Sequence, residues 1–534
     1  MSQPIRCLPP SALVVGFDFS TGGAKALAFD LQGNTVASTR LPTDLWTDYA
    51  ATDDPKLVRD TGSREISALF LEGQVRAATR AISAELAAIG RLSDWHVAGI
   101  SATHHTAGRV DARHNPVRRM YCWNDQTLAD YHAEGLSRLG GQERAVELTG
   151  GPWAVRYSLS HLVKDSHTPA GKSDSLLSRA DWERTKWVLM HGALAAAYLT
   201  DRWGAASVSC AASTGIMNLR TNEWRREMLD ALPAEYRDLA WGSLPKIVDM
   251  NAPLGRVAEH LALDAGLPPG VRPAVFPTLD DQAAGLIGGG AVDAGQVAII
   301  LGNSAVVNSS SASLPTANNL DAMKLNWGPY LWMRCYSNGA QFLDRVVGPN
   351  RTGAEWKALT EAATKVAPRC GGVSVLPFLL SEPSLGVAQP RFKWSPAEPA
   401  ADAVGVRVRA SFEAIAYLIA LGVKAHEAAG QQVTRVSVSG GIAKNDLMVK
   451  ILASVLNRPL ERLVSDEGSA LGAAVAAVAG AEASARQAAR VADPFTAADA
   501  VAAMVRFKDR VEPEAAWVAA YQTGLTDFEK QMKS

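Results

Sequence analysis

A strand, a turn of small residues and a second strand occur twice in this chain, and this repeated pattern constrains the fold more than any other feature. In the first copy, a β-branched run reaches Asp18 and the turn Ser20-Thr21-Gly22-Gly23 follows. The second copy spans residues 296–308 around the turn Gly302-Asn303-Ser304. Because each copy reads as a hairpin with a polar tip, the pattern predicts two copies of one fold.

The tip of the first hairpin carries groups that suit a phosphate chain and Mg²⁺. Ser20, Thr21, Gly22 and Gly23 can present hydroxyls and bare backbone N–H groups to a phosphoryl chain. Asp18 can hold a hydrated Mg²⁺ that bridges the phosphate oxygens. An ordinary hairpin with a glycine turn is the alternative explanation.

Length and charge limit the kind of protein and the kind of partner. A chain of 534 residues is too long for one compact core, so two or more domains are expected. With 20% charged and 47% hydrophobic residues the composition is typical of a soluble globular protein. A formal net charge of -1 gives no electrostatic case for nucleic acid or an anionic membrane, which favours a small-molecule partner.

The pattern of cysteines predicts a reducing cytoplasm, and the hydropathy of the chain predicts that it has no membrane-spanning segment. The five cysteines are scattered and lack a Cys-x-x-Cys pair, so neither a disulfide framework nor a zinc site built on cysteine is expected. The apolar run Leu13–Val15 is cut by Asp18, too short for a signal peptide. The alanine-rich stretch 470–480 is expected to be too short and too weakly hydrophobic to span a membrane.

Hydrophobic periodicity predicts an α/β fold. After the first hairpin we expect a third strand over 35–39, a helix over about 64–89 and a strand over 97–101, the start of a ribonuclease H-like domain. Further expectations are a helix over 182–200, a linker over 392–403, a strand over 433–439 leading into a helix, and helices from about residue 494.

Several segments resemble one family in order and spacing. Gly16-Phe17-Asp18-Phe19-Ser20-Thr21, with Lys25 and Asp30, resembles the first phosphate motif of the FGGY carbohydrate kinases, members of the actin/hexokinase/Hsp70 ATPase superfamily. Gly302-Asn303-Ser304 resembles the second phosphate motif, usually Gly-Thr-Ser, and 440–446 resembles the adenosine motif. The resemblance implies ATP and Mg²⁺, with Asp18 at the metal. The implied cofactor contacts are Asp18, Ser20, Thr21, Gly22, Lys25, Gly302, Asn303, Ser304, Gly440, Gly441 and Asn445.

Two segments resemble the sugar site of xylulokinase-type members. Residues 100–106 correspond to a Gln-Met-His-Gly stretch, and Trp123-Asn124-Asp125 matches the family's Trp-Asn-Asp. The resemblance implies that His105, Trp123, Asn124 and Asp125 bind sugar, since such side chains hydrogen-bond hydroxyls and pack on a C–H face. A structural histidine is the alternative for His105.

Departures from the family pattern accompany these segments. Thr103 and His104 stand where Gln and Met are usual, Thr127 where Arg is usual, and Pro383 lies in a loop that normally contains Arg. The adjacent histidines are not expected to hold a metal, because neighbouring strand residues point to opposite faces and no third ligand sits at metal spacing.

A carboxylate pair, Asp280-Asp281, follows a strand and opens a helix of small residues. Open α/β folds place catalytic groups at such a junction. Asp281-Gln282-Ala283-Ala284 resembles the segment that carries the family's general base, which implies Asp281 as the catalytic residue and Gln282 as a sugar contact. Asp280 replaces a usual glycine. Helix N-capping is the alternative role for Asp281.

The resemblance implies two ribonuclease H-like, actin-like ATPase domains, 11–270 and 271–534, around an interdomain cleft. The expected activity is transfer of the ATP γ-phosphoryl group to the terminal hydroxyl of a ketopentose, with D-xylulose first. Another ketose such as ribulose, or a polyol such as glycerol or erythritol, is the alternative acceptor. A nucleotide-driven clamp like the chaperone or filament members is the alternative from another class. Pairing as a homodimer is left open.

Overall fold

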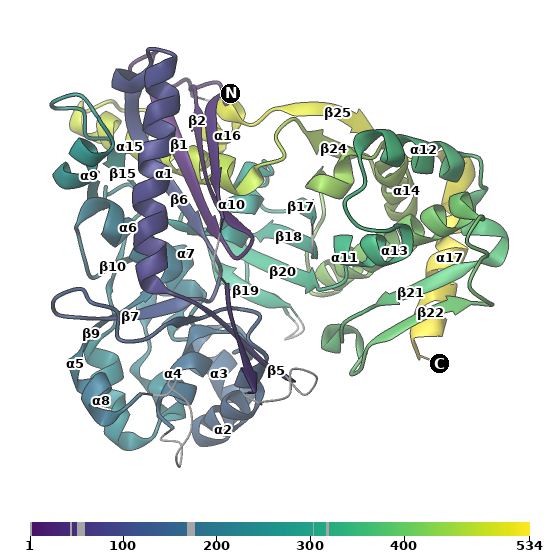
Figure 1. Ribbon diagram of the computed structural model, residues 1–534, viewed down its shortest axis with the longest axis horizontal. Helices are drawn as coiled ribbons and strands as arrows, with labels where there is room; N and C mark the ends of the chain where they lie inside the picture. The colour runs from purple at the N-terminus through teal and green to yellow at the C-terminus, as the bar shows by residue number, and fades with distance from the viewer. Residues whose placement is uncertain are drawn as a thin grey trace. The chain divides into compact units, whose positions relative to one another are not determined.

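The protein divides into two compact units. The computed structural model describes residues 3–42, 45–50, 59–167, 177–302, 304–316 and 320–533. The first unit contains Met1–Gly288, Asp321–Leu331 and Ser469–Val505, and the second contains Gly289–Leu320, Trp332–Gly468 and Arg506–Ser534. The chain therefore returns to the first unit after building most of the second (Figure 1). The domain limits expected from the sequence, 11–270 and 271–534, stay a prediction about functional domains.

The central sheet of the first unit has the strand order β14-β15-β6-β1-β2-β3, with β16 also paired to β6. Its strands are β1 (Leu13–Ser20), β2 (Gly23–Phe29), β3 (Thr35–Leu41), β6 (Trp95–Ala102), β14 (Gly255–Arg256), β15 (Ala274–Val275) and β16 (Leu279–Asp280). The hairpin β1–β2 is antiparallel, whereas β1 and β16 both run parallel to β6. The carboxyl ends of these three strands therefore meet at one edge of the sheet. This confirms the expected strands near 35–39 and 97–101.

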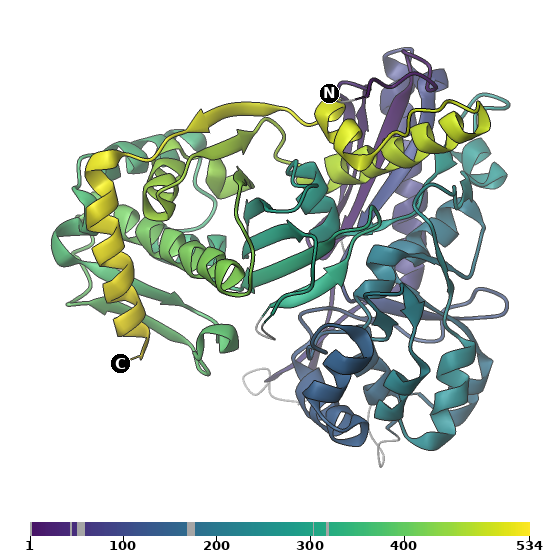
Figure 2. The ribbon, with the colours of Figure 1, turned by 180° about the vertical axis from the view of Figure 1, so that it is seen from behind.

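Helices cover both faces of this sheet. Helix α1 (Ala68–Ala88) lies on one face, and α15 (Gly468–Ala488) lies on the other, as the two views show (Figures 1 and 2). Gly16 and Gly99 are register partners on β1 and β6. A Cβ on either would come within 1.9 Å and 2.0 Å of the Ala470 and Ala473 carbonyl oxygens of α15. The two glycines therefore let helix backbone rest directly on strand backbone.

Helix α15 corrects one expectation from the sequence. It has 21 residues and, with a mean hydropathy of 1.2 in its best window, is long and apolar enough to cross a membrane by length and composition. The expectation that the alanine-rich stretch is too short was wrong, because the helix extends on both sides of 470–480. However, 72% of that window is buried inside the protein, so the apolar surface serves the core.

The rest of the first unit surrounds a second sheet with the order β4-β5-β8-β7-β9. Its strands are β4 (Leu45–Ala50), β5 (Arg59–Ile66), β7 (Ala107–Asp111), β8 (Met120–Tyr121) and β9 (Thr185–Met190). Shorter pairs are β10 (Ala205–Ser207) with β13 (Lys246–Val248), and β11 (Met217–Asn218) with β12 (Glu223–Trp224). The helices are α2 (Ala129–Leu139), α3 (Gln142–Thr149), α4 (Ser158–Asp165), α5 (Arg179–Arg184), α6 (His191–Thr200), α7 (Val208–Ala212), α8 (Ala234–Gly242), α9 (Glu259–Asp264), α10 (Asp281–Gly288) and α16 (Ala497–Met504).

Two predicted helices in this unit have different limits. The helix expected over 64–89 begins at Ala68, because Ser67 caps it by accepting a hydrogen bond from the Phe70 N–H, and the preceding residues belong to β5. The helix expected over 182–200 is interrupted by β9, whose residues pair with β7. Pairing with a distant strand overrides local helical periodicity there.

The second unit repeats the core arrangement of the first. Its sheet contains the order β20-β18-β17-β23-β24-β25. The strands are β17 (Gln296–Leu301), β18 (Ala305–Ser311), β20 (Tyr330–Tyr336), β23 (Arg435–Ser439), β24 (Leu460–Leu463) and β25 (Phe507–Val511). The hairpin β17–β18 is antiparallel and β23 runs parallel to β17, as β6 does to β1. The repeated fold predicted from the two hairpins is confirmed.

Helices pack around this sheet. They are α11 (Ala340–Val347), α12 (Gly353–Thr364), α13 (Val404–Ala428), α14 (Asp446–Leu456) and α17 (Ala515–Lys533). A separate hairpin joins β21 (Ser374–Phe378) and β22 (Arg391–Ser395), and β19 (Asp321–Lys324) belongs to the first unit. The linker expected over 392–403 was therefore partly wrong, because its first residues pair as β22. The expectation of helices after residue 494 missed β25, which pairs with β24.

Candidate active site

Asp18, the residue expected to hold Mg²⁺, lies at the carboxyl end of β1. It is 6% exposed and accepts a 2.9 Å hydrogen bond from the Ser101 hydroxyl on β6. Lys25 is its register partner on β2. A buried carboxylate is unfavourable without partners, and the Ser101 hydroxyl supplies one for Asp18 at this edge of the sheet.

The turn of the first hairpin is closed by Ser20. Its hydroxyl donates to the Gly23 carbonyl oxygen at 2.9 Å and accepts from the Gly22 N–H at 3.3 Å. Thr21 is half-buried and Gly22 is exposed. In this structure the Ser20 hydroxyl thus stabilises the turn, and phosphate contact by 20–22 stays a prediction.

Asp280 and Asp281 have different roles at the junction of β16 and α10. Asp280 Oδ1 accepts hydrogen bonds from the Gln282 and Ala283 N–H groups at 3.0 and 2.9 Å, so Asp280 caps the helix. Capping by Asp281, the alternative from the sequence, was wrong because the helix begins at Asp281 itself. The carboxylate of Asp281 is therefore available for chemistry.

The surroundings of Asp281 favour its protonated form. Burial raises the pKa of its carboxyl to about 8, and the charges of Asp280 and Asp18 add to this effect. The backbone N–H of His104 donates to Oδ1 at 3.2 Å, and a hydrogen bond from the Gln282 side chain also acts on the carboxylate. A carboxylate with a pKa near neutrality is a strong enough base to accept a hydroxyl proton.

His105 is enclosed rather than open to a ligand. Its Nδ1 lies 2.8 Å from the Ser213 carbonyl oxygen, and Arg156 Nε donates to its Nε2 at 3.2 Å. Its ring stacks between those of His104 and Tyr157, with centroid distances of 3.6 and 4.4 Å. These are the surroundings of the structural histidine weighed as the alternative, and contact with sugar stays a prediction that requires Arg156 to give way.

The segment Trp123-Asn124-Asp125 joins β8 to a short 3₁₀ helix. Asp125 is buried, caps this helix through the Thr127 N–H at 2.9 Å, and accepts from the Arg64 N–H at 2.8 Å. Trp123 and Asn124 are half-buried, and Asn124 Oδ1 has no hydrogen-bond partner within the described ranges. Asn124 is thus better placed than Asp125 to accept a bond from an acceptor hydroxyl.

In the second unit, the segments expected to bind nucleotide pack against each other. The Gly302 N–H donates to the Ser304 carbonyl oxygen at 3.0 Å, whereas Asn303 lies outside the described residues. Gly440 has φ +95°, and a Cβ on it would lie 2.4 Å from the Leu301 carbonyl oxygen. This close approach places the start of the adenosine-type segment beside the end of β17.

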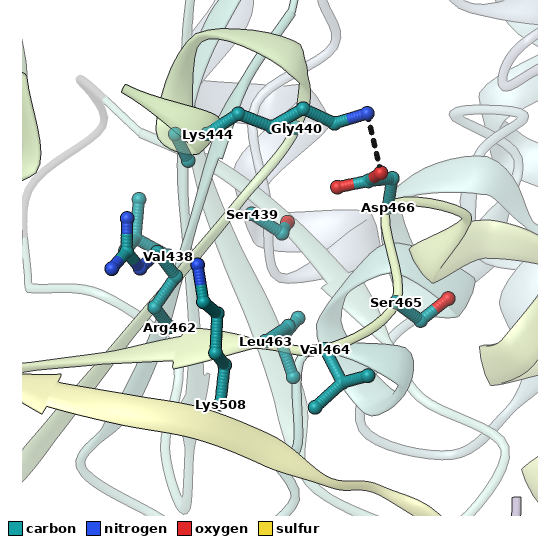
Figure 3. Close-up of a pocket in the computed structure, with 11 residues that line it drawn as sticks. Val438, Ser439, Gly440, Lys444, Arg462, Leu463, Val464, Ser465, Asp466 and Lys508 are labelled. Atoms are coloured by element: carbon teal, nitrogen blue, oxygen red, sulfur yellow. Dashed lines mark ion pairs between the residues drawn. The ribbon is translucent and has the colours of Figure 1, made fainter. Parts of the chain in front are cut away.

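A cavity of about 350 Å³ lies along the adenosine-type segment (Figure 3). It is lined at the carboxyl ends of β23 and β24, by Gly440 and Lys444 on one side and Ser465 and Asp466 on another. The Lys444 and Asp466 side chains form an ion pair at 2.6 Å. Beneath this segment, Asn445 caps α14 and its Nδ2 donates to Thr360 Oγ1 at 2.6 Å. Asn445 therefore holds this segment in place, and its contact with nucleotide stays a prediction.

Comparison with known proteins identifies the family. Residues 13–288 match the model of the FGGY family of carbohydrate kinases, N-terminal domain, and residues 298–481 match the C-terminal domain. The chain belongs to the FGGY family of carbohydrate kinases. It is an ATP-dependent phosphotransferase that acts on a small sugar or polyol. The alternative of a clamp-like ATPase without an acceptor is thereby set aside.

The proteins similar to this FGGY kinase include glycerol kinases and xylulose kinases. The chain is 24% identical over 497 residues to a glycerol kinase of Limosilactobacillus reuteri, covering 86% of this chain and 87% of that protein. The crystal structure of a xylulose kinase from Rhodospirillum rubrum is similar, with TM-score 0.76, 22% identity and 98% coverage of both chains. Plasmodium falciparum glycerol kinase with ADP gives TM-score 0.76, 16% identity and 98% coverage of both chains. These likenesses confirm the expected actin-like ATPase fold.

The sequence did not reveal a network of buried charges in this FGGY kinase. Asp165 accepts from Arg109 at 2.7 Å and from Arg118 at 2.6 Å, and Arg118 also donates to Glu65 at 2.5 Å. The Lys164 ammonium donates to Thr127 Oγ1 at 2.6 Å, which ties the network to the Asp125 cap. The only local signal was a charge inside an apolar run, such as Arg109 in β7.

Proposed function

We propose that this FGGY kinase transfers the γ-phosphoryl group of ATP to the terminal hydroxyl of a ketopentose, with D-xylulose as the first candidate. The observation that carries the proposal is Asp281, a carboxylate with a pKa near 8 between Asp280 and Asp18. The resemblance of residues 100–106 and 121–127 to xylulokinase-type segments supports the ketopentose. A polyol is the second candidate, since a glycerol kinase is among the relatives.

Asp281 is the proposed general base. Its carboxylate accepts the proton of the acceptor hydroxyl while the hydroxyl oxygen forms a bond to the γ-phosphorus and ADP leaves. The Gln282 amide, which already interacts with this carboxylate, is close enough in sequence to bind the hydroxyl next to the reacting one. His105, Trp123, Asn124 and Asp125 are the other proposed acceptor contacts, with Asn124 Oδ1 the acceptor that most needs a partner.

Asp18 is the proposed partner of a hydrated Mg²⁺. The residues fit this ion, because the carboxylate of Asp18 and the hydroxyl of Ser101 are oxygen groups of the kind that suits a hard cation that keeps its water. Mg²⁺ held there would neutralise the charge that develops on the phosphoryl group during transfer. The chain itself supplies the carboxylate of Asp18, held in place by the Ser101 hydroxyl.

The proposed nucleotide contacts lie on the two hairpin turns and on the adenosine-type segment. The turns 20–22 and 302–304, with Lys25, offer N–H groups, hydroxyls and a cation to the phosphate chain. Gly440, Gly441 and Asn445 border the region for adenosine, where bare backbone can lie against the ligand. All five cysteines are free, which fits the proposed location in a reducing cytoplasm.

A panel of acceptors tests the substrate. Initial rates of ADP release are measured with D-xylulose, D-ribulose, ketohexoses, glycerol and erythritol at saturating ATP. We expect D-xylulose to give the highest kcat/KM, because a site built to bind a particular hydroxyl rejects analogues that lack it by up to roughly 10⁴-fold. A higher kcat/KM for glycerol or erythritol would leave the kinase activity in place but would rule out a ketopentose as the preferred acceptor.

A further inference from the structure

His104 and Asp280, two residues at which this chain departs from the family pattern, lie against each other. His104 Nε2 is 3.8 Å from Asp280 Oδ1, and their side chains are only 5% and 3% exposed. They come from segments 176 positions apart, so the sequence does not show their proximity. The expectation that His104 lacks further metal ligands considered only its neighbours along the chain.

Both side chains carry an unused polar atom in the interior. His104 Nε2 and Asp280 Oδ2 are buried and have no hydrogen-bond partner among the residues that the structure describes. Leaving such atoms without a partner is unfavourable, more so for a charged group. Two unpartnered buried atoms, on side chains that approach within 3.8 Å, therefore point to a ligand shared by them.

Asp281 completes the group. One potential ligand atom from each of His104, Asp280 and Asp281 lies within 4.8 Å of the other two. A zinc ion binds imidazole nitrogen and carboxylate oxygen tetrahedrally at about 2.0–2.2 Å, so two of its ligand atoms lie about 3.3–3.6 Å apart. Small side-chain rotations would bring the three atoms to bonding distance.

The charges and the ring chemistry select the kind of ligand. The buried carboxylate of Asp280 and the half-buried one of Asp281, on which the charge of Asp18 also acts, favour a cation. The imidazole of His104 adds a nitrogen ligand. The ring is also held in place by stacking on His105. Imidazole with carboxylates suits Zn²⁺ and related transition metals better than Mg²⁺, which prefers oxygen alone.

We propose that His104 Nε2, Asp280 Oδ2 and a carboxylate oxygen of Asp281 form a binding site for a divalent transition-metal ion of the zinc class. The site takes its metal without nucleotide, unlike the Mg²⁺ that Asp18 is proposed to hold. Three protein ligands leave one position open for water, as in zinc sites that exchange their fourth ligand.

Zinc titration of the full-length, nucleotide-free protein tests the site. We expect calorimetry to show one Zn²⁺ bound per chain, with an equal concentration of Mg²⁺ failing to displace it. His104→Met should weaken binding at least about tenfold. Asp280→Asn should do the same while retaining a side-chain oxygen that caps α10, and His260→Ala, at an exposed histidine, should leave affinity unchanged.

The location of the ion provides the second readout. Anomalous diffraction at the zinc edge should place it between His104 and Asp280. Absence of binding, wild-type affinity in both variants, or an ion placed elsewhere would each overturn the proposal. Should His104→Met fail to fold, Asp280→Asn and the anomalous signal still decide it.

The effect on turnover rests on the proposed function. Because zinc would occupy the carboxylate proposed as the base, micromolar Zn²⁺ at saturating Mg-ATP should inhibit the wild-type enzyme and inhibit His104→Met less. Zinc binding at this position without inhibition would support the metal site but would contradict the proposal that Asp281 is the base. Inhibition that is equal in wild type and His104→Met would instead count against the metal site.

Discussion

The surroundings of Asp281 raise the pKa of its carboxyl, and this makes its carboxylate better suited to accept a proton than that of an ordinary Asp. Asp281→Asn retains size and a hydrogen-bonding side chain but removes the basic oxygen. We expect acceptor-dependent turnover to fall by at least about 10²-fold, with ATP affinity nearly unchanged, because general bases contribute on this scale. A coupled assay of ADP release and calorimetry with ATP measure the two quantities. Near-normal turnover would show that another residue is the general base, with Asp280 as the first alternative.

The raised pKa of Asp281 also makes stability depend on pH. Its pKa is about 8 in the folded protein against 3.8 for an ordinary Asp, so between these values the folded state keeps a proton that the unfolded chain has released. The wild type therefore loses stability as pH rises through this window, whereas Asp281→Asn does not lose this contribution. In metal-free buffer without nucleotide, the gain in Tm of Asp281→Asn should be absent near pH 4 and largest above about pH 8. A gain in Tm that is constant across pH would contradict the assignment.

Single residues differ in how well the sequence predicts their surroundings. Asp18 lies near the end of β1 and Asp281 directly follows β16, and both strands run parallel to β6, so their meeting at one sheet edge follows from parallel pairing. His105 is different, because Arg156 and Ser213 engage its ring from segments about 50 and 108 positions away. Motif matching finds the histidine but cannot reveal that both of its nitrogens are already bonded.

At the scale of elements, α15 packs through backbone contacts that leave no room for side chains. A Cβ on Gly472 would lie 1.9 Å from the Ala284 carbonyl oxygen of α10, whereas one on Gly468 would meet nothing within 4 Å. Gly472→Ala should therefore lower the free energy of unfolding by about 1–3 kcal/mol, as overpacking does. Gly468→Ala, on the same helix, should change it by less than about 0.5 kcal/mol. Denaturant titration of both variants compares them, and equal effects would argue against the close packing.

The adenosine-type segment offers a matched pair of glycines. Gly440→Ala should destabilise the protein, because φ is +95° and a Cβ would lie 2.4 Å from the Leu301 carbonyl oxygen. Gly441 is exposed with nothing within 4 Å of its Cβ position, so Gly441→Ala should leave Tm unchanged. If the Gly441 backbone lies against adenosine, KM for ATP should rise about fivefold with kcat retained, the signature of lost uniform binding. An unchanged KM would remove Gly441 from the nucleotide site.

Elements were predictable where local pattern and tertiary pairing agree. The two hairpins are apolar runs on either side of small turn residues, and both form; β1 then pairs with β6 and β17 with β23. The strands β9 and β25 were missed, because their residues become strands only by pairing with β7 and β24. Local periodicity carries no information about partners that are distant in sequence.

At the scale of the molecule, the first unit depends on residues near the other end of the chain. Residues 469–505 belong to this unit and supply the helix that covers Gly16 and Gly99. A chain that ends at residue 467 should therefore expose the apolar face of β1 and β6 and aggregate, even though residues 1–288 are intact. Soluble yield and 8-anilinonaphthalene-1-sulfonate (ANS) fluorescence measure this outcome. A soluble, monomeric chain without ANS binding would show that the face is covered in another way.

The return of α15 sets an order on folding during protein synthesis. The ribosome releases the strands of the first sheet early, yet Ser469–Val505 emerges only after most of the second unit has been translated. Domains usually fold as they leave the ribosome, N-terminal part first. One face of the sheet that carries Asp18 therefore stays uncovered while residues 289–468 are translated. The final packing of α15 on this sheet forms largely after these residues have been made.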